Sequence, residues 1–337
     1  MRAAARWWVR LAAIAAVAAL TGGCAQDIAS PPGEAVGPDA VRIGAFRTTM
    51  PAWNTTLDDF AGQPGWPGAQ AVYGAFGTIE DVLQHGEDVD ILHISDAWNM
   101  RELVRDDFVP ADWNNGRTGG VPVASIVTMV VRAGNPRDIH DWADLMQPGL
   151  EVVTPNPATE GSGRTALLAA YAAGSNGGAD PEAGRDYVRR LILEHIVLGP
   201  TSVWEARENF LDGRGDVLLL SEAAARTLQR DGYAVETVVP RQTLRMDFPV
   251  ALTYAGLQKP TARALVAYMY SARGQQVWAD NGFRPTTKVA GVADPRFPEP
   301  DRVWTVEDLG GWDVVGPRFF HPENGIYSKL FRTATGT

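Results

Sequence analysis

The chain has 337 residues, of which 45% are hydrophobic and 21% are charged, and its formal net charge is −10. This length exceeds what one hydrophobic core usually organises, and the composition is that of a folded globular protein, so two lobes are expected and wholesale disorder is excluded. The acidic balance argues against a nucleic-acid-binding protein, which needs a basic face, and it leaves any anionic ligand dependent on local hydrogen-bond donors.

The N-terminus has the pattern of an export signal. Three arginines precede an apolar run, Leu11–Leu20, that is too short for a permanent membrane span. Cys24, the only cysteine, ends the sequence LTGGC, which resembles a lipoprotein lipobox with Thr21 where an aliphatic residue is usual. We expect 1–23 to be a signal peptide, Cys24 to be lipidated, and 24–40 to be a linker to the membrane surface. Ordinary cleavage nearby, without lipidation, is the alternative.

From Val41 onward, strand-like and helix-like segments alternate, without an internal repeat. This alternation predicts parallel α/β sheets with crossovers, in which ligands lie at the carboxyl ends of strands and at helix N-termini. Three places have that geometry: Thr48-Thr49, Gly161–Gly163 and Ser221. In chain order we expect a strand over 41–46, a strand over 89–94, a helix over 99–107, a strand over 123–132, a short helix within 134–149, a strand over 150–155, a helix after Gly163, an amphipathic helix over 186–196, a strand–turn–helix unit over 216–232, a strand over 248–257 and helices over 262–283.

One stretch places small residues where a helix begins; it reads VVTPNPATEGSGRTALLAAYAAG and covers 152–174. Gly161, Ser162 and Gly163 could offer donors to an anion, but the same turn is equally a helix entry loop without a ligand. A Walker-type phosphate loop is excluded, because Arg164-Thr165 follow the turn where that loop requires GK[ST].

The motifs GNP, IHDW and TPNP precede this turn in the sequence IVTMVVRAGNPRDIHDWADLMQPGLEVVTPNPATEGSGRTALLAAY. GRGDVLLLSEAA, YMYSARGQQVWADNGFRP and WTVEDLGGW follow in order. This order, from about Val121 to Trp312, resembles that of the periplasmic sulfate/thiosulfate-binding proteins of ABC importers. The resemblance implies an α/β, type II periplasmic-binding-protein fold with two lobes, a hinge and a ligand cleft. On that template lobe 1 comprises 41–122 plus 250–337, and lobe 2 comprises 123–249.

In that family a dehydrated oxyanion is held by neutral donors, mainly backbone N–H groups at helix N-termini, without a cation. Two contacts change type here. The family's indole donor falls on Ser221, and the serine of its glycine-rich loop is missing near Tyr73-Gly74. The ligand-binding residues that the resemblance implies are Thr49, Tyr73, Gly74, Gly161, Ser162, Gly163, Ser202 and Ser221.

Three charged residues near these positions have two interpretations each, and one aromatic residue has a single one. Glu160 is either a solvated charge at a helix start or a carboxylate that faces the site, where it would repel sulfate but accept a proton from hydrogen phosphate. Arg47 and Arg164 form surface ion pairs, unless one of them points inward and holds a sulfonate or carboxylate. Trp204 lies beside Ser202 and could wall the cleft.

The histidines show no metal-ligand spacing, and no nucleophile motif is present, so we expect no metal, no cofactor and no catalytic residue. The leading hypothesis is a monomeric, lipid-anchored solute-binding protein that delivers a small inorganic oxyanion to an ABC permease with its ATPase subunits. The alternatives are a binding protein for phosphate, molybdate or an organosulfonate, or a surface lipoprotein that keeps the fold with a degraded pocket. An enzyme on the same fold is a distant third.

Overall fold

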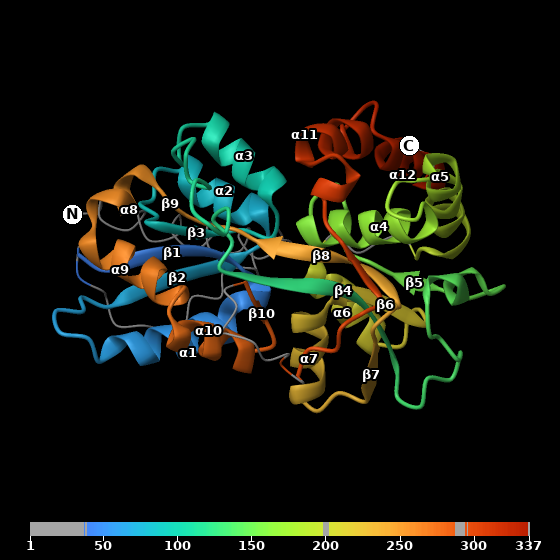
Figure 1. Cartoon of the computed structure of the whole chain (residues 1–337), viewed down its shortest axis with the longest axis horizontal. Helices are drawn as coiled ribbons and strands as arrows, with labels where there is room; N and C mark the ends of the chain where they lie inside the picture. Colours follow the sequence, from blue (N-terminus) through green and yellow to red (C-terminus); the bar gives the residue numbers. More distant parts are fainter. Residues whose placement is uncertain (1–36, 38, 198–201, 287–293, 295, 336–337) are drawn as a thin grey trace, which may run out of the picture.

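The computed structural model describes residues 37, 39–197, 202–286, 294 and 296–335. They form two lobes, each built around its own β-sheet (Figure 1). The expected signal peptide, the lipidation site at Cys24 and most of the expected linker lie outside the described residues. Within those ranges, no helix combines the length and the apolar character that a membrane crossing requires.

The first lobe contains a four-stranded sheet in the order β2-β1-β3-β9. β1 reads VRIGAF and is buried along most of its length, as expected for a central strand covered by helices on both faces. It pairs in parallel with β2 and β3, whereas β9 is antiparallel to β3. The elements of this lobe are β1 (Val41–Phe46), η1 (Arg47–Thr49), α1 (Met50–Ala61), β2 (Ala69–Gly74), α2 (Phe76–Gln84), β3 (Ile91–His93), α3 (Ala97–Arg105), β9 (Val250–Leu252), α8 (Tyr254–Gln258), α9 (Pro260–Met269) and α10 (Ala272–Asp280).

The second lobe contains a sheet in the order β11-β8-β4-β6-β5, and β7 and β10 also pair with β4. β4 reads VASIVTMVVR and is buried at every position except the last, so it forms the centre of this sheet. The elements are β4 (Val123–Arg132), η2 (Trp142–Met146), β5 (Val152–Val153), α4 (Gly161–Gly174), α5 (Pro181–Arg190), η3 (Leu191–His195), α6 (Val203–Leu211), β6 (Val217–Ser221), α7 (Glu222–Arg230), β7 (Val235–Val238), β8 (Gln242–Phe248), β10 (Arg284–Pro285) and β11 (Arg302–Trp304).

β4 and β8 connect the lobes (Figure 1). β4 enters the second lobe and β8 returns from it, so the two strands run in opposite directions and pair antiparallel, with Val123 opposite Phe248. β6 and β7 are also antiparallel to β4. The expected α/β fold with two lobes is confirmed, but the expectation of parallel sheets is only partly right, because both sheets are mixed.

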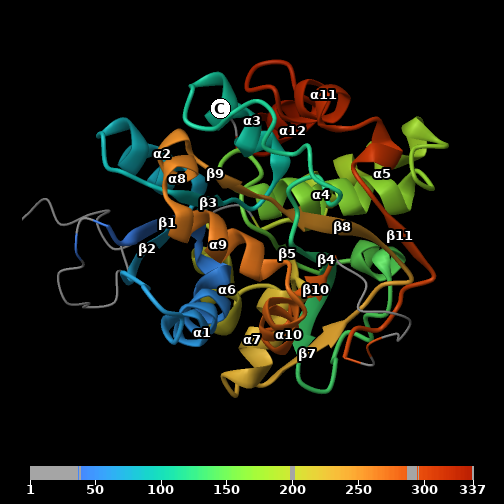
Figure 2. The same cartoon turned by 60° about the vertical axis from the view of Figure 1, so that its left-hand side comes forward.

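The C-terminal segment, residues 302–335, covers α4. Tyr327 donates a hydrogen bond from its hydroxyl to the carbonyl of Leu167 at 2.8 Å, and the ring of Tyr171 packs edge-on against that of Phe319. The segment also reaches the first lobe, where Arg101 of α3 forms an ion pair with Asp313. Figure 2 shows α11 beside α3. The elements here are η4 (Glu307–Leu309), α11 (Trp312–Val315), η5 (Gly316–Phe320) and α12 (Ile326–Thr335).

Candidate functional site

A cleft lies between the two lobes and has about 620 Å³ of space free of protein atoms, part of it open to solvent. Both lobes contribute to its wall, and so do the returning strand β8 and the ends of β1, β2 and β6. The lining residues are Phe46, Arg47, Thr48, Gly74, Ala75, Ser95, Glu160, Ser162, Ser202, Val203, Trp204, Leu220, Ser221, Ala224, Met246 and Phe248.

Four α-helices begin at the wall of this cleft. Ala75 is the N-cap of α2 in the first lobe, and Glu160, Ser202 and Ser221 are the N-caps of α4, α6 and α7 in the second. The first N–H groups of a helix have no partner within the helix, and together they carry about half a positive charge. The convergence of four such ends makes the cleft attractive to a negative ligand without any metal ion.

Serine hydroxyls add donors to these helix starts. Ser162 lies in the first turn of α4, and its buried Oγ has no hydrogen-bond partner among the described residues. Ser202 Oγ accepts from the amide of Glu205 at 3.1 Å, and Ser221 Oγ accepts from the amide of Ala224 at 3.2 Å. An N-cap serine that accepts in this way keeps its O–H group for donation to a ligand.

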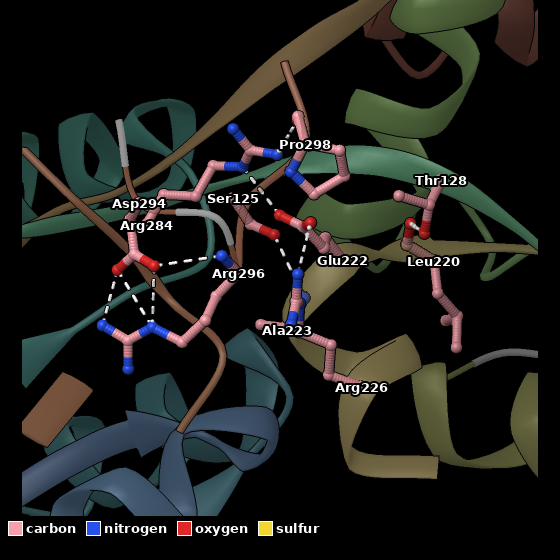
Figure 3. A network of polar contacts seen from close by, with 10 residues as sticks. All are labelled: Ser125, Thr128, Leu220, Glu222, Ala223, Arg226, Arg284, Asp294, Arg296 and Pro298. Atoms are coloured by element: carbon pink, nitrogen blue, oxygen red, sulfur yellow. Dashed lines mark hydrogen bonds and ion pairs between the residues drawn. The ribbon is translucent and has the colours of Figure 1, made fainter. Parts of the chain in front are cut away.

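The start of α7 is held in place by a buried ionic network (Figure 3). Glu222, whose side chain is almost inaccessible, pairs with Arg284 at 2.6 Å and with Arg226 at 3.1 Å. The amide of Ala223 donates to Ser125 Oγ of β4 at 3.2 Å. These contacts tie the first turn of α7 to β4 and β10, so the position of the neighbouring Ser221 is well defined.

The floor of the cleft is apolar. Phe46, Leu220, Met246 and Phe248 line it, and the rings of Phe46 and Phe248 lie 4.8 Å apart between centroids. Apolar walls lower the local dielectric constant, and this strengthens hydrogen bonds from the helix N-termini to a bound charge. A small, strongly accepting anion fits this combination of an apolar floor and converging donors.

Two charged side chains line the cleft from opposite lobes. Glu160 is only 7% exposed, so its interpretation as a solvated charge is wrong. Arg47 lies over the ring of Trp204, with its guanidinium carbon 4.9 Å from the ring centroid. Trp204 lines the cleft, as the sequence suggested. Arg164 is not a surface residue either, because its buried side chain pairs with Asp96 of the first lobe at 3.0 Å.

The structure brings four of the eight sequence-predicted ligand residues to the cleft wall: Gly74, Ser162, Ser202 and Ser221. The other four lie close by but are not part of the lining. Thr49 is buried and donates from its hydroxyl to the carbonyl of Phe46 at 2.6 Å, and Tyr73 is a core residue. A Cβ atom on Gly161 would clash with Ser95 and Asp96, and one on Gly163 would clash with the carbonyl of Pro155. Ligand binding by all eight residues stays a prediction.

Sequence reasoning missed Ser95 as a lining residue. It follows β3 directly and precedes Asp96, the N-cap of α3. A serine between a buried strand and a helix cap was the available signal, the same signal that identified Ser221. In the part of the chain that the structure covers, no cluster of three or more His, Cys, Asp or Glu side chains could hold a metal ion.

Known proteins are similar to the whole of this two-lobed region. The family model described as bacterial extracellular solute-binding protein matches residues 41–284. The sulfate-binding protein of Synechococcus elongatus is 28% identical over 347 residues, which cover 98% of each chain. The thiosulfate-binding protein of Pseudomonas aeruginosa is 30% identical over 267 residues, 76% of each chain. The solved structure of the sulfate-binding protein SubI from Mycobacterium tuberculosis has 37% identity and a TM-score of 0.77, and it covers 84% of this chain and 99% of its own.

Proposed function

Because the chain belongs to the family of bacterial extracellular solute-binding proteins, we propose that it binds a tetrahedral oxyanion, sulfate or thiosulfate, and delivers it to an ABC permease. The ligand occupies the cleft between the lobes. The relatives with known ligands, by name sulfate- and thiosulfate-binding proteins, support this choice of anion. They are binding proteins, and we extend that to this chain: it carries out no reaction of its own.

The observation that carries the proposal is the convergence of four helix N-termini at one cleft. Together with the hydroxyls of Ser162, Ser202 and Ser221, these helix ends supply hydrogen-bond donors for an anion, so binding requires no metal ion. A fully ionised sulfate offers only acceptors, so such a set can replace its water of hydration. The ligand set is that of the sequence prediction, extended by Thr48 and Ser95.

Calorimetric titration tests this function. Every described helix and strand lies between Val41 and Thr335, so a chain without residues 1–24 keeps the whole fold. We expect this chain to bind sulfate or thiosulfate and to unfold at a higher temperature in their presence, since a ligand of the native state stabilises it by mass action. Absence of heat and of any thermal shift with both anions would count against the proposal and favour a surface lipoprotein with a degraded pocket.

A second candidate ligand is an anion that carries a proton, such as hydrogen phosphate. The buried carboxylate of Glu160 at the cleft favours it, because a carboxylate can accept that proton but repels a full dianion. Titration with phosphate and molybdate beside sulfate separates the candidates. Phosphate binding that is tighter than sulfate binding and is lost in Glu160→Gln would assign the cleft to the protonated anion.

Delivery to a permease requires that the lobes open and close. The lobe division that we propose places 41–122 and 250–283 in one lobe and 123–249 together with β10 in the other, with β4 and β8 as connections. For the C-terminal segment, the pairing of β11 with β8 and the contacts of α12 with α4 and η3 favour the second lobe rather than the first. Closure follows from the higher affinity of the closed state for the ligand.

The remaining parts of the proposal concern the N-terminus. The family supports export of the chain, and the LTGGC sequence supports a lipid on Cys24 that anchors the monomer to the outer face of the membrane. Expression of the full chain with Cys24→Ser tests the anchor. Partition of the unmodified chain into detergent, and of the variant into the aqueous phase, is the expected result; equal partition of both would contradict it.

A further inference from the structure

We infer that Arg47 and Trp204 form an inter-lobe contact that brings a cation to the anion cleft on closure and slows ligand release. This inference rests on the proposed function and adds to it a charge-delivering residue and a residue that positions it. The family pattern carried over from sequence uses neutral donors only, and neither residue belongs to it.

The two residues come from opposite lobes. Arg47 follows β1 directly, at the start of η1 in the first lobe, and Trp204 lies in the first turn of α6 in the second. The guanidinium of Arg47 lies over the indole ring, 4.9 Å from its centroid, and both side chains line the cleft. A guanidinium on the face of an indole is a favourable cation–π arrangement, and it forms here only when the lobes approach.

The second lobe holds the indole ring through an arginine of its own. Arg207, one turn further along α6, lies over the ring of Trp204 at 4.7 Å and over that of Tyr233 at 5.1 Å. Trp204 is 41% exposed, so a ring without such a neighbour would be free to change rotamer. Arg207 restricts the ring to the orientation in which Arg47 meets it, and Arg207 itself is not a lining residue of the cleft.

The charges explain what the contact contributes. Among the described residues that line the cleft, Arg47 is the only basic one and Glu160 the only acidic one. With Arg47 in place the side chains of the wall sum to zero charge, and the helix N-termini make the cleft positive. When the lobes separate, Arg47 leaves with the first lobe and Glu160 stays with the second beside the N-termini of α4, α6 and α7, so the open half-site is less positive than the closed cleft. Closure therefore adds the positive charge of Arg47 to the surroundings of the anion and slows its release.

Two arginine variants test the inference with the same change of charge. Arg47→Gln should weaken sulfate or thiosulfate binding by at least about tenfold, because it removes the only basic side chain among the described lining residues while the carboxylate of Glu160 stays at the cleft. Arg207→Gln makes the same change of charge but loosens the ring of Trp204 instead of removing the cation from the cleft wall, so its effect on affinity should be smaller. We expect Arg207→Gln to change affinity by less than about threefold. Adding Glu160→Gln to Arg47→Gln should restore most of the lost affinity.

The association and dissociation rates of the anion distinguish a positioning role of Trp204 from a general loss of structure. Trp204→Leu should raise the dissociation rate of the anion about fivefold in stopped-flow measurements and leave the association rate nearly unchanged, because the contact forms only after the ligand has entered. Trp204→Phe keeps an aromatic face and should recover part of this effect. Thermal unfolding without ligand identifies any variant that fails to fold.

The outcomes distinguish this inference from the proposed function. Equal losses of affinity in Arg47→Gln and Arg207→Gln, or an unchanged dissociation rate in Trp204→Leu, would overturn the inference while anion binding by the unmodified chain stands. An unmodified chain that binds neither anion would overturn both.

Discussion

Arg164 of the second lobe donates to Asp96 of the first across a distance of 3.0 Å, and their side chains are only 5% and 3% exposed. Arg164 also donates to Asn99 Oδ1 at 2.8 Å and to the carbonyl of Pro157 at 3.2 Å. A buried ion pair is held only while both partners are present, because a single buried charge loses its hydration without compensation. Separation of the lobes breaks this pair and exposes both groups to water, so the pair influences the balance between the closed and the open state.

Loss of one partner should therefore reduce anion affinity. In Arg164→Met the closed state buries Asp96 without its cation, at a cost of about 3–5 kcal/mol for a fully buried pair. In the open state water solvates Asp96, so the variant pays little of this cost there and the closed state is destabilised relative to the open state. We expect weaker sulfate binding by calorimetry and a larger radius of gyration with ligand by small-angle X-ray scattering.

Adding Asp96→Asn is the control for this variant, since asparagine keeps the N-cap bond to Asn99 and carries no charge. The double variant should regain much of the affinity. A single Arg164→Met variant with unchanged affinity and scattering would show that the pair has no part in closure.

Two glycines in the same turn should respond differently to the same substitution. In Gly161→Ala the new methyl group would lie closer than 3.0 Å to Ser95 and Asp96 of the opposite lobe, so it should oppose closure and weaken anion binding. In Gly163→Ala it would meet the carbonyl of Pro155 within the second lobe and should lower the unfolding temperature instead. Calorimetry and thermal unfolding on both variants check this separation, and a loss of affinity without loss of stability in Gly163→Ala would contradict it.

The cleft serines should also separate affinity from stability. Ser162 Oγ has no partner within the described structure, so Ser162→Ala should reduce anion affinity and leave the free energy of unfolding unchanged. Ser221 caps α7, so Ser221→Ala should reduce affinity and also cost about 1 kcal/mol of stability. Chemical denaturation without ligand measures the second effect. Equal stability losses in the two variants would be inconsistent with these roles.

His93 predicts a pH dependence of stability. Burial lowers its pKa to about 3, from the ordinary value of 6.5, and Trp53 donates to its Nδ1 at 3.1 Å. Between these pH values His93 binds a proton in the unfolded chain but stays neutral in the native chain. The contribution of His93 to the free energy of unfolding should thus be complete above pH 6.5. It should decrease as the pH is lowered, by up to about 1.4 kcal/mol per pH unit.

Urea denaturation above and below pH 6.5, on the unmodified chain and on His93→Gln, measures this contribution. Glutamine keeps an acceptor for Trp53 and does not titrate. The variant should lose less stability on acidification than the unmodified chain. The same pH dependence in both would exclude His93 as its source.

The sequence predicted strands well where a buried strand is mostly apolar. The expected strands over 41–46 and 123–132 coincide with β1 and β4. It missed β8, which reads QTLRMDF, because Arg245 and Asp247 make an inter-lobe strand look like a surface loop. The expected strand over 248–257 was wrong over most of its length, since the chain leaves β9 at Leu252 and begins α8 at Tyr254.

The candidate site was predictable only in part, for a physical reason. Ser221 carries a local signal, because it caps a helix that its own sequence predicts, whereas Ser202 was identified through the resemblance. Ser95 and the contact between Arg47 and Trp204 depend on how two lobes, joined through strands far apart in the chain, approach each other. A local sequence pattern does not contain information about how closely residues of the two lobes approach. The resemblance to known binding proteins supplied the lobes but not these side chains.

The C-terminal segment has a consequence for the order in which the molecule is completed. Ala166–Ala172 on α4 are almost inaccessible, and part of their cover comes from Phe319 and Tyr327, which follow α4 at a long distance in the chain. Until those residues are synthesised, an alanine- and leucine-rich helix keeps an uncovered apolar flank. The second lobe therefore cannot reach its final packing before Phe319 and Tyr327 have been synthesised, and a chain that is still loosely packed at that stage can be threaded through a narrow translocation channel.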